Sequence, residues 1–245
     1  MTSKTKTKII CELHPQHRGD INDLESMILQ CKMFGGDMVK LQLYDTLKLH
    51  GNTDRKHLEI TAEELKRINN LCKNINMELF CSVFDEEKIQ WCIDLNFKYI
   101  KIASRSFKEA NLVHKVLDSG KKVFISNGFD QKDFKYKHEN LEYFYCTPQY
   151  PTLLPDAKIP EFTDYSGFSD HTLGITACKI AAQRGAKYIE KHFTLNKNMH
   201  IDCEKGHLGS MDYKELQQLK QFINENQLVN DWIRKMYKKV RDRTL

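Results

Sequence analysis

Residues 167–195 read GFSDHTLGITACKIAAQRGAKYIEKHFTL and contain a clear strand–helix–strand pattern. Short apolar runs at 165–171 and 188–194 have the length of β-strands, and the segment at 175–185 between them is typical of a helix. A strand, a helix and a second strand in this order form a βαβ unit, in which the strands lie parallel. A histidine stands at or near the end of each predicted strand, so the two imidazoles are expected at the same edge of the sheet.

The same alternation of short apolar runs and amphipathic segments continues through the chain. The eight predicted strands are 8–14, 38–44, 78–84, 99–104, 122–128, 141–146, 165–171 and 188–194. Eight such units in 245 residues predict an α/β fold of the (β/α)8, or TIM, barrel type, which commonly runs to about 250 residues. A doubly wound sheet is the alternative, because the connections after the fifth and sixth strands are too polar or too rich in proline for a clear helix.

One barrel domain is predicted over 1–228, followed by a helical extension over 229–245. The extension is basic and amphipathic. Its apolar face comprises Trp232, Ile233, Met236, Tyr237 and Val240. Such a face predicts a packing surface, either on the barrel of the same chain or on a second copy in a homodimer.

Charge and cysteine usage disfavour several classes of protein. The net charge is +5, but basic and acidic residues are interleaved, which disfavours a nucleic-acid binder and suits a small anionic ligand. The eight cysteines include no CxxC pair, and several fall in apolar segments, which indicates a reduced, cytoplasmic protein. Charged residues interrupt every apolar run, so neither a signal peptide nor a membrane-spanning helix is expected.

Polar residues stand at the predicted C-terminal ends of the strands, where barrel enzymes carry their active sites. Lys40 and Lys101 lie inside otherwise apolar strands, and a buried ammonium group requires an anionic partner. Serines at neighbouring strand ends favour a phosphate or carboxylate ligand for these lysines. The alternative is that strand carboxylates such as Glu12 or Glu190 neutralise them.

His171 and His192 follow two successive predicted strands. Neutral imidazole is the commonest side-chain ligand of metal ions, and two such ligands leave open positions for water and substrate. The pair therefore favours a metal site. The alternative is that both are core histidines whose nitrogens are satisfied by neighbouring groups.

The ordered set of motifs at the strand ends resembles that of the N-acetylneuraminate (sialic acid) synthase family, which condenses phosphoenolpyruvate with an N-acylated hexosamine. The resemblance extends over nearly the whole chain. In chain order, the motifs are CELHPQHRGD (11–20), VKLQ (39–42), CSVFD (81–85), KIAS (101–104), ISNG (125–128), CTPQYPT (146–152), SDHTLG (169–174) and EKHFTL (190–195).

The resemblance implies roles for individual residues. His171 and His192 would bind a catalytic divalent metal, typically Mn²⁺, with Mg²⁺ or Co²⁺ as alternatives, and Glu12 would face the reacting centre. The groups that would hold phosphoenolpyruvate are Lys40, Ser82, Lys101, Ser104, Ser126, Gln149 and Ser169, and those near the acceptor sugar are Gln42, Tyr150 and Asp202. The implied product is a nonulosonic, sialic-acid-like 2-keto-3-deoxy acid, released with phosphate.

Departures from the family pattern concentrate on the acceptor side. The segment 45–60 is shorter than the usual acceptor loop, Arg105-Ser106 replaces Gly-Glu, and Asp202-Cys203 replaces Asp-His. The sequence ends after the barrel, so the antifreeze-like C-terminal domain of typical members, which supplies an arginine to the acceptor sugar of a neighbouring subunit, is not expected. The identity of the acceptor sugar therefore stays open. Two alternatives to a synthase also stay open: a barrel lyase or aldolase acting on another phosphorylated ligand, and a barrel that binds an anionic sugar without catalysis.

Overall fold

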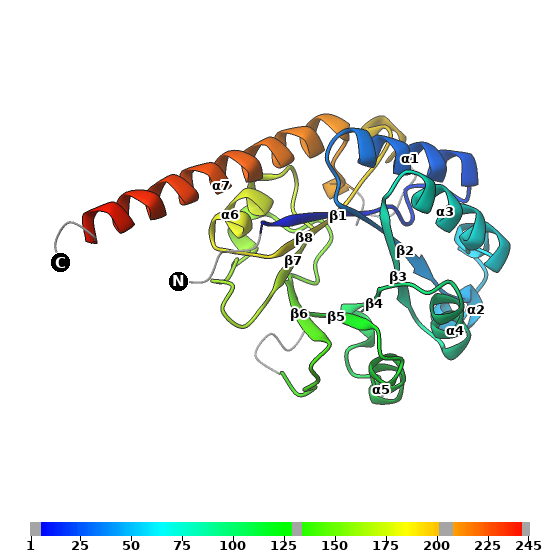
Figure 1. The fold of residues 1–245 in the computed structure, drawn as a ribbon. Coiled ribbons are helices and arrows are strands. Elements are labelled where there is room, and N and C mark those ends of the chain that lie inside the picture. The colour runs from blue at the N-terminus through cyan, green and yellow to red at the C-terminus, as the bar shows by residue number, and fades with distance from the viewer. Residues whose placement is uncertain (1–5, 129–133, 201–207, 242–245) are drawn as a thin grey trace.

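Eight parallel strands pair in sequence order, and β1 pairs with β8 to close a barrel (Figure 1). The computed structural model describes residues 6–128, 134–200 and 208–241. The strands are β1 (Lys8–Glu12), β2 (Met38–Leu43), β3 (Glu78–Val83), β4 (Tyr99–Ile102), β5 (Lys122–Asn127), β6 (Leu141–Cys146), β7 (Gly167–Asp170) and β8 (Tyr188–His192). The predicted barrel is confirmed, and closure between β1 and β8 excludes the doubly wound sheet. The predicted strand boundaries differ from the observed ones by at most two residues.

Helices surround the barrel and follow most of the strands (Figure 1). They are α1 (Ile21–Met33), α2 (Thr46–His50), α3 (Ala62–Asn74), α4 (Glu86–Asp94), α5 (Ala110–Asp118), α6 (Thr176–Gln183) and α7 (Tyr213–Arg241), with 3-10 turns η1 (Lys56–Leu58), η2 (Ser104–Ser106), η3 (Leu154–Asp156) and η4 (Lys197–His200). The described residues between β5 and β6 contain no helix, and only η3 lies between β6 and β7. These are the two connections whose composition disfavours a helix.

Local sequence signals fix the ends of several helices. Thr61 and Glu64 form a capping box at the start of α3, in which each side chain accepts a hydrogen bond from the other residue's backbone N–H. Asp20 accepts from the N–H groups of Asn22 and Asp23 at the start of α1. The cap at Asp20 ends the loop that follows β1, and the cap at Thr61 ends the longer connection after β2, which contains α2 and η1.

Alternate residues of each strand point into the barrel, and the part of its interior nearer the N-terminal ends of the strands is apolar. Seven buried side chains, most of them aromatic, fill this part and form what we call the aromatic layer: Ile10, Met38, Phe80, Tyr99, Phe124, Phe144 and Tyr188. β7 contributes Gly167, where an added Cβ would lie 2.6 Å from the ring of Phe144. The absence of a side chain on β7 therefore makes room for that ring. Two residues further along most strands, the inward-facing residues are polar, so the layer forms the base of a polar cavity.

Outward-facing residues of the strands join the surrounding helices in a second, larger apolar core. Cys11, Val39 and Ile100, for example, are fully buried there. Seven cysteines in the described part of the chain are buried and form no disulfide. They serve as small apolar side chains, as the composition predicts for a reduced protein.

The C-terminal helix is continuous across the predicted boundary at 228. Leu216, Leu219 and Ile223 are buried, and beyond them α7 extends away from the barrel (Figure 1). The exposed apolar residues on this distal part are Leu228, Val229, Trp232, Ile233 and Met236. The side chains of Tyr237 and Val240, which complete the predicted face, lie outside the described residues. Within the described residues, no helix is both long and apolar enough to cross a membrane.

Candidate active site

A cavity of about 740 Å³ lies at the C-terminal ends of the strands and is lined by side chains from all eight of them. Its size falls in the range of small-molecule binding sites. The predicted site residues that line it are Glu12, Lys40, Gln42, Ser82, Lys101, Ser104, Ser126, Tyr150, Ser169, His171 and His192. Gln149 is exposed and does not line the cavity, whereas its neighbours Pro148 and Tyr150 do. Asp202 lies outside the described residues.

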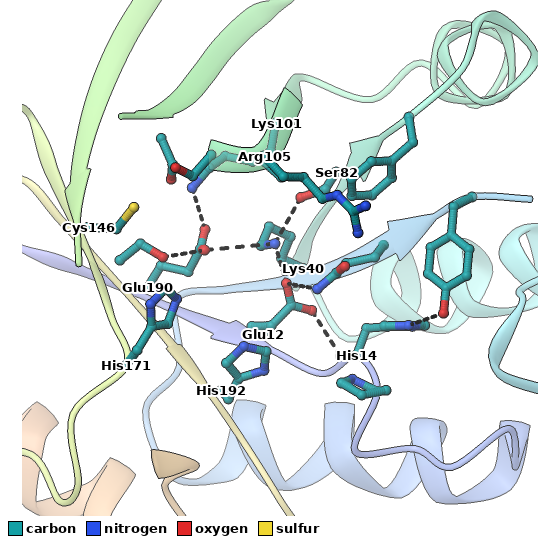
Figure 2. Close-up of a pocket in the computed structure, with 18 of the residues that line it drawn as sticks. Glu12, His14, Lys40, Ser82, Lys101, Arg105, Cys146, His171, Glu190 and His192 are labelled. Atoms are coloured by element: carbon teal, nitrogen blue, oxygen red, sulfur yellow. Dashed lines mark hydrogen bonds and ion pairs between the residues drawn. The ribbon is translucent and has the colours of Figure 1, made fainter. Parts of the chain in front are cut away.

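Two lysine–glutamate pairs form the floor of this cavity (Figure 2). Lys40 forms an ion pair with Glu12, and Lys101 Nζ lies 2.8 Å from Glu190 Oε2. A distance of 3.8 Å between Lys40 Nζ and Glu190 Oε1 links the pairs into one network. Glu12 and Glu190, which the sequence analysis names as alternative partners of the lysines, therefore both neutralise them. The same lysines face the cavity, so the ion pairs and a role in binding an anionic ligand are compatible.

The network sets the ionisation of the two carboxylates differently. Burial alone would raise the pKa of Glu190, but the charges of Lys101 and Lys40 outweigh it and hold the value at about 2. Burial raises the pKa of Glu12, and the charge of Lys40 offsets this only in part. Glu190 is therefore a fixed negative charge between the lysines, whereas Glu12 is the carboxylate more readily protonated.

Hydroxyl groups complete the floor. Ser82 Oγ accepts a hydrogen bond from Lys40 Nζ at 2.9 Å, and Ser169 Oγ donates to Glu190 Oε1 at 2.9 Å. Ser104 Oγ accepts from the backbone N–H of Gly128 at 3.0 Å. Ser82 and Ser104 accept in these bonds and keep their own O–H groups for an anion, so together with the lysines they match the chemistry of a phosphate or carboxylate.

The two histidines stand together at one side of the cavity, with ring centroids 6.3 Å apart. His171 Nδ1 donates to the carbonyl of Thr147 at 2.9 Å, and His192 Nδ1 lies 3.1 Å from Gln16 Oε1. A hydrogen on Nδ1 leaves the lone pair on Nε2, which is the arrangement found in metal-binding histidines. Burial lowers the pKa of His171 to about 4, so its ring is neutral at neutral pH. Among the described residues, no group of three or more His, Cys, Asp or Glu side chains has metal-binding geometry.

A buried ion pair supports the histidines from behind. Lys191 Nζ lies 2.7 Å from Asp170 Oδ2 and donates to the carbonyl of Thr172 at 2.8 Å. Asp170 precedes His171 and Lys191 precedes His192, so the pair joins the ends of β7 and β8 next to the residues that carry the two imidazoles.

Several lining residues are not among the predicted site residues, and Glu190 is predicted only as a possible partner of the lysines. Glu190 stands two positions after Tyr188, so strand alternation alone places it on the inner face. His14, Tyr44 and Arg55 come from loops or strand ends, where no periodic signal exists. Arg105 appears in the sequence only as a departure from a family motif, yet it lines the cavity.

Comparisons with known proteins agree with the motifs. The model of the NeuB family matches residues 27–233. The N,N'-diacetyllegionaminic acid synthase of Legionella pneumophila is 27% identical over 260 residues, covering 90% of this chain and 72% of that protein. The N-acetylneuraminate-9-phosphate synthase of Mus musculus is 26% identical over 247 residues, covering 86% and 67%. The crystal structure of an N-acetylneuraminic acid synthetase from Leptospira borgpetersenii, in complex with citrate, has a similar fold, with a TM-score of 0.85, 24% identity and coverage of 92% and 85%.

The low pKa of Glu190 predicts a pH-dependent contribution to stability. Its folded-state pKa of about 2 lies below that of an unfolded glutamate, so the stabilisation is complete above the unfolded value and is lost as the pH falls towards 2. Glu190→Gln should therefore lower the free energy of unfolding by roughly 3 kcal/mol at pH 7, and the difference from wild type should shrink between pH 4.5 and 2.

Urea unfolding at a series of pH values measures this difference, and Glu139→Gln, at an exposed glutamate, is the control. A difference between wild type and Glu190→Gln that stays constant from pH 7 to pH 2 would contradict the assignment.

Proposed function

The chain belongs to the NeuB family, and we propose that it condenses phosphoenolpyruvate with an aldose, an N-acyl hexosamine or a relative, to give a sialic-acid-like 2-keto-3-deoxy acid and phosphate. The observation that carries the proposal is the buried floor of the cavity. There Lys40 and Lys101 lie among serine hydroxyls beside a pair of histidines. The family assignment, the motifs and this donor set support the same chemistry.

Phosphoenolpyruvate carries a phosphate and a carboxylate, and we propose that both bind at the floor. Lys40 and Lys101 each provide ammonium protons, Ser82 and Ser126 provide hydroxyl donors from β3 and β5, and Ser104 provides one from η2. Because the lysines come from rigid strands and are already oriented by Glu12 and Glu190, little reorganisation accompanies ligand binding. The same cations then stabilise the charge of the departing phosphate.

A divalent metal, Mn²⁺ or a related ion, is assigned to His171 and His192. The neutral ring of His171 and the hydrogen-bonded Nδ1 atoms of both histidines suit this role. When bound, such an ion supplies Lewis-acid polarisation of the acceptor's aldehyde. The ring of Tyr150 packs against His171 with a centroid distance of 4.0 Å.

The proposed reaction forms one carbon–carbon bond and breaks one carbon–oxygen bond. The methylene carbon of phosphoenolpyruvate attacks the aldehyde carbon, and the aldehyde oxygen takes up a proton. Water adds to the adjacent cationic carbon and loses a proton, and the phosphate leaves with its bridging oxygen as that carbon becomes a ketone. Glu12, which accepts a hydrogen bond from Gln42 at 3.4 Å and whose pKa burial raises, is the group proposed to take the proton from water.

Phosphate release tests the proposal. Purified protein with phosphoenolpyruvate and Mn²⁺ should release phosphate only when a suitable acceptor is added from a panel of N-acyl hexosamines and simple aldoses. Turnover of another phosphorylated ligand without phosphoenolpyruvate would favour the lyase or aldolase. Binding of phosphoenolpyruvate by calorimetry without phosphate release from any acceptor would favour the non-catalytic barrel.

Removing either histidine should abolish turnover and leave the fold intact. For His171→Ala and His192→Ala we expect Mn²⁺ affinity, measured by isothermal titration calorimetry, to fall at least tenfold, because each variant loses one of two imidazole ligands. His138→Ala, at an exposed histidine away from the cavity, is the matched control. Wild-type Mn²⁺ affinity combined with lower thermal stability in both variants would instead identify core histidines.

The exposed apolar face of α7 leads us to propose a homodimer. A row from Leu228 to Met236 projects from the barrel and is left uncovered by the rest of the described chain. Light scattering at micromolar concentration should give twice the chain mass for the full chain and the single-chain mass for a truncation after Leu228. A monomeric full-length protein would contradict the dimer.

A further inference from the structure

The cavity has a second set of cations, at its mouth, that the proposed reaction does not use. Arg105 lies in η2, directly after β4, and Arg55 lies in the connection between α2 and α3. Both arginines line the cavity, and so does His50. Figure 2 shows the Arg105 side chain reaching into the cavity on the side of Lys40 and Ser82. Loops from two strands therefore bring their positive charges to one side of the opening.

The charges of the lining do not balance. Lys40 and Lys101 are neutralised at the floor by Glu12 and Glu190, which are the only carboxylates in the described lining. Arg105 adds a positive charge that no carboxylate of the described lining neutralises. Burial, and after it the charges of Arg55 and Arg105, lower the pKa of His50, which indicates that the three groups lie within electrostatic range of one another.

Arg105 in particular is held in place without being neutralised. In the part of the chain that the structure describes, its one hydrogen bond runs from Nη2 to the carbonyl of Leu49 at 3.4 Å, and it forms no ion pair. That bond ties the guanidinium to α2 and leaves most of its five N–H donors for a ligand. By contrast, the buried Lys40, Lys101 and Lys191 all have carboxylate partners.

The position of Arg105 separates it from the groups assigned to phosphoenolpyruvate. Of those groups, Lys40, Ser82, Lys101, Ser126 and Ser169 stand on the strands at the floor, whereas Arg105 stands in η2, after Ser104, and Arg55 stands in the connection between α2 and α3. A cavity of about 740 Å³ is much larger than a three-carbon ligand requires, so the second substrate must occupy the space towards the loops. Arg105 also stands where the resembled family has Gly-Glu, a change that removes an acid and adds a guanidinium.

We propose that the acceptor is an anionic sugar, and that Arg105, with Arg55 beside it, binds a phosphate or carboxylate on the acceptor at the end remote from the aldehyde. A guanidinium matches either group because it donates two parallel hydrogen bonds to a pair of oxygens. The inference rests on the proposed function for the identity of the site as an acceptor site. It adds a substrate class and a specificity-determining residue.

Paired acceptors test the proposal. Formation of the 2-keto-3-deoxy product is measured with saturating phosphoenolpyruvate and Mn²⁺ for an N-acyl hexosamine, its 6-phosphate and the corresponding uronic acid. Wild type should favour one anionic acceptor over the neutral sugar by tenfold or more in kcat/KM, and the preferred one identifies the group. Equal use of all three, or preference for the neutral sugar, would overturn the proposal.

Variants assign the preference to Arg105. Arg105→Gln should lower kcat/KM for the anionic acceptor roughly tenfold to a hundredfold, with the KM for phosphoenolpyruvate and the rate with the neutral sugar unchanged. Arg105→Lys should retain part of the preference, because it keeps the positive charge but loses the two parallel N–H donors of the guanidinium. Lys48→Gln, which removes an exposed charge from α2 without touching the cavity, is the control. A change confined to the KM for phosphoenolpyruvate would place Arg105 in the other substrate site and overturn the proposal.

A binding measurement keeps this inference separate from the reaction. If no acceptor is turned over, the proposed synthase activity fails. The anionic and neutral sugars are then titrated calorimetrically into wild type and Arg105→Gln. Binding of an anionic sugar that weakens at least tenfold in Arg105→Gln would support the subsite. Equal affinity in both proteins, or no binding to wild type, would overturn it.

Discussion

The architecture of the site depends on two ammonium groups held inside a barrel. Lys40 and Lys101 are almost fully buried, and an uncompensated charge in that position would cost several kcal/mol. Glu12 and Glu190 compensate them from β1 and β8, so four strands contribute to one network. The network therefore ties the two strands that close the barrel to the strands that carry the cations. An anion binding there meets donors that folding has already oriented.

Strand alternation separates the parts of the barrel that provide stability from those that provide chemistry. The inward residue at one level is apolar, and the inward residue two positions later is charged or hydroxylic: Phe80 precedes Ser82, Tyr99 precedes Lys101, and the aromatic layer as a whole underlies the floor. Lys101 Nζ lies 4.2 Å from the centroid of the Phe144 ring, so the two levels are in direct contact. The rigid aromatic layer thereby limits how far the lysine can move.

The sequence predicts the strands and the polar strand ends well, because both follow from local periodicity. The pairing of Lys101 with Glu190 joins residues 89 positions apart and becomes definite only when the barrel closes, so the sequence leaves it as one of two alternatives. Gln149 belongs to a motif that resembles a binding motif, but the backbone around it turns its side chain to solvent. Arg55 and Arg105 lie on loops, whose course no periodic pattern records. The boundary at 228 follows composition, whereas α7 crosses it as one continuous helix.

The aromatic layer also has a consequence for the order in which ligands bind. Its side chains fill the barrel beneath Lys101, so within the described structure the cavity opens only towards the loops that follow the strands. Whatever occupies the mouth beside Arg105 blocks the path of whatever lies on the lysines. A ligand of the floor must therefore enter before the mouth is filled, and the shape of the barrel favours ordered binding of two molecules inside it.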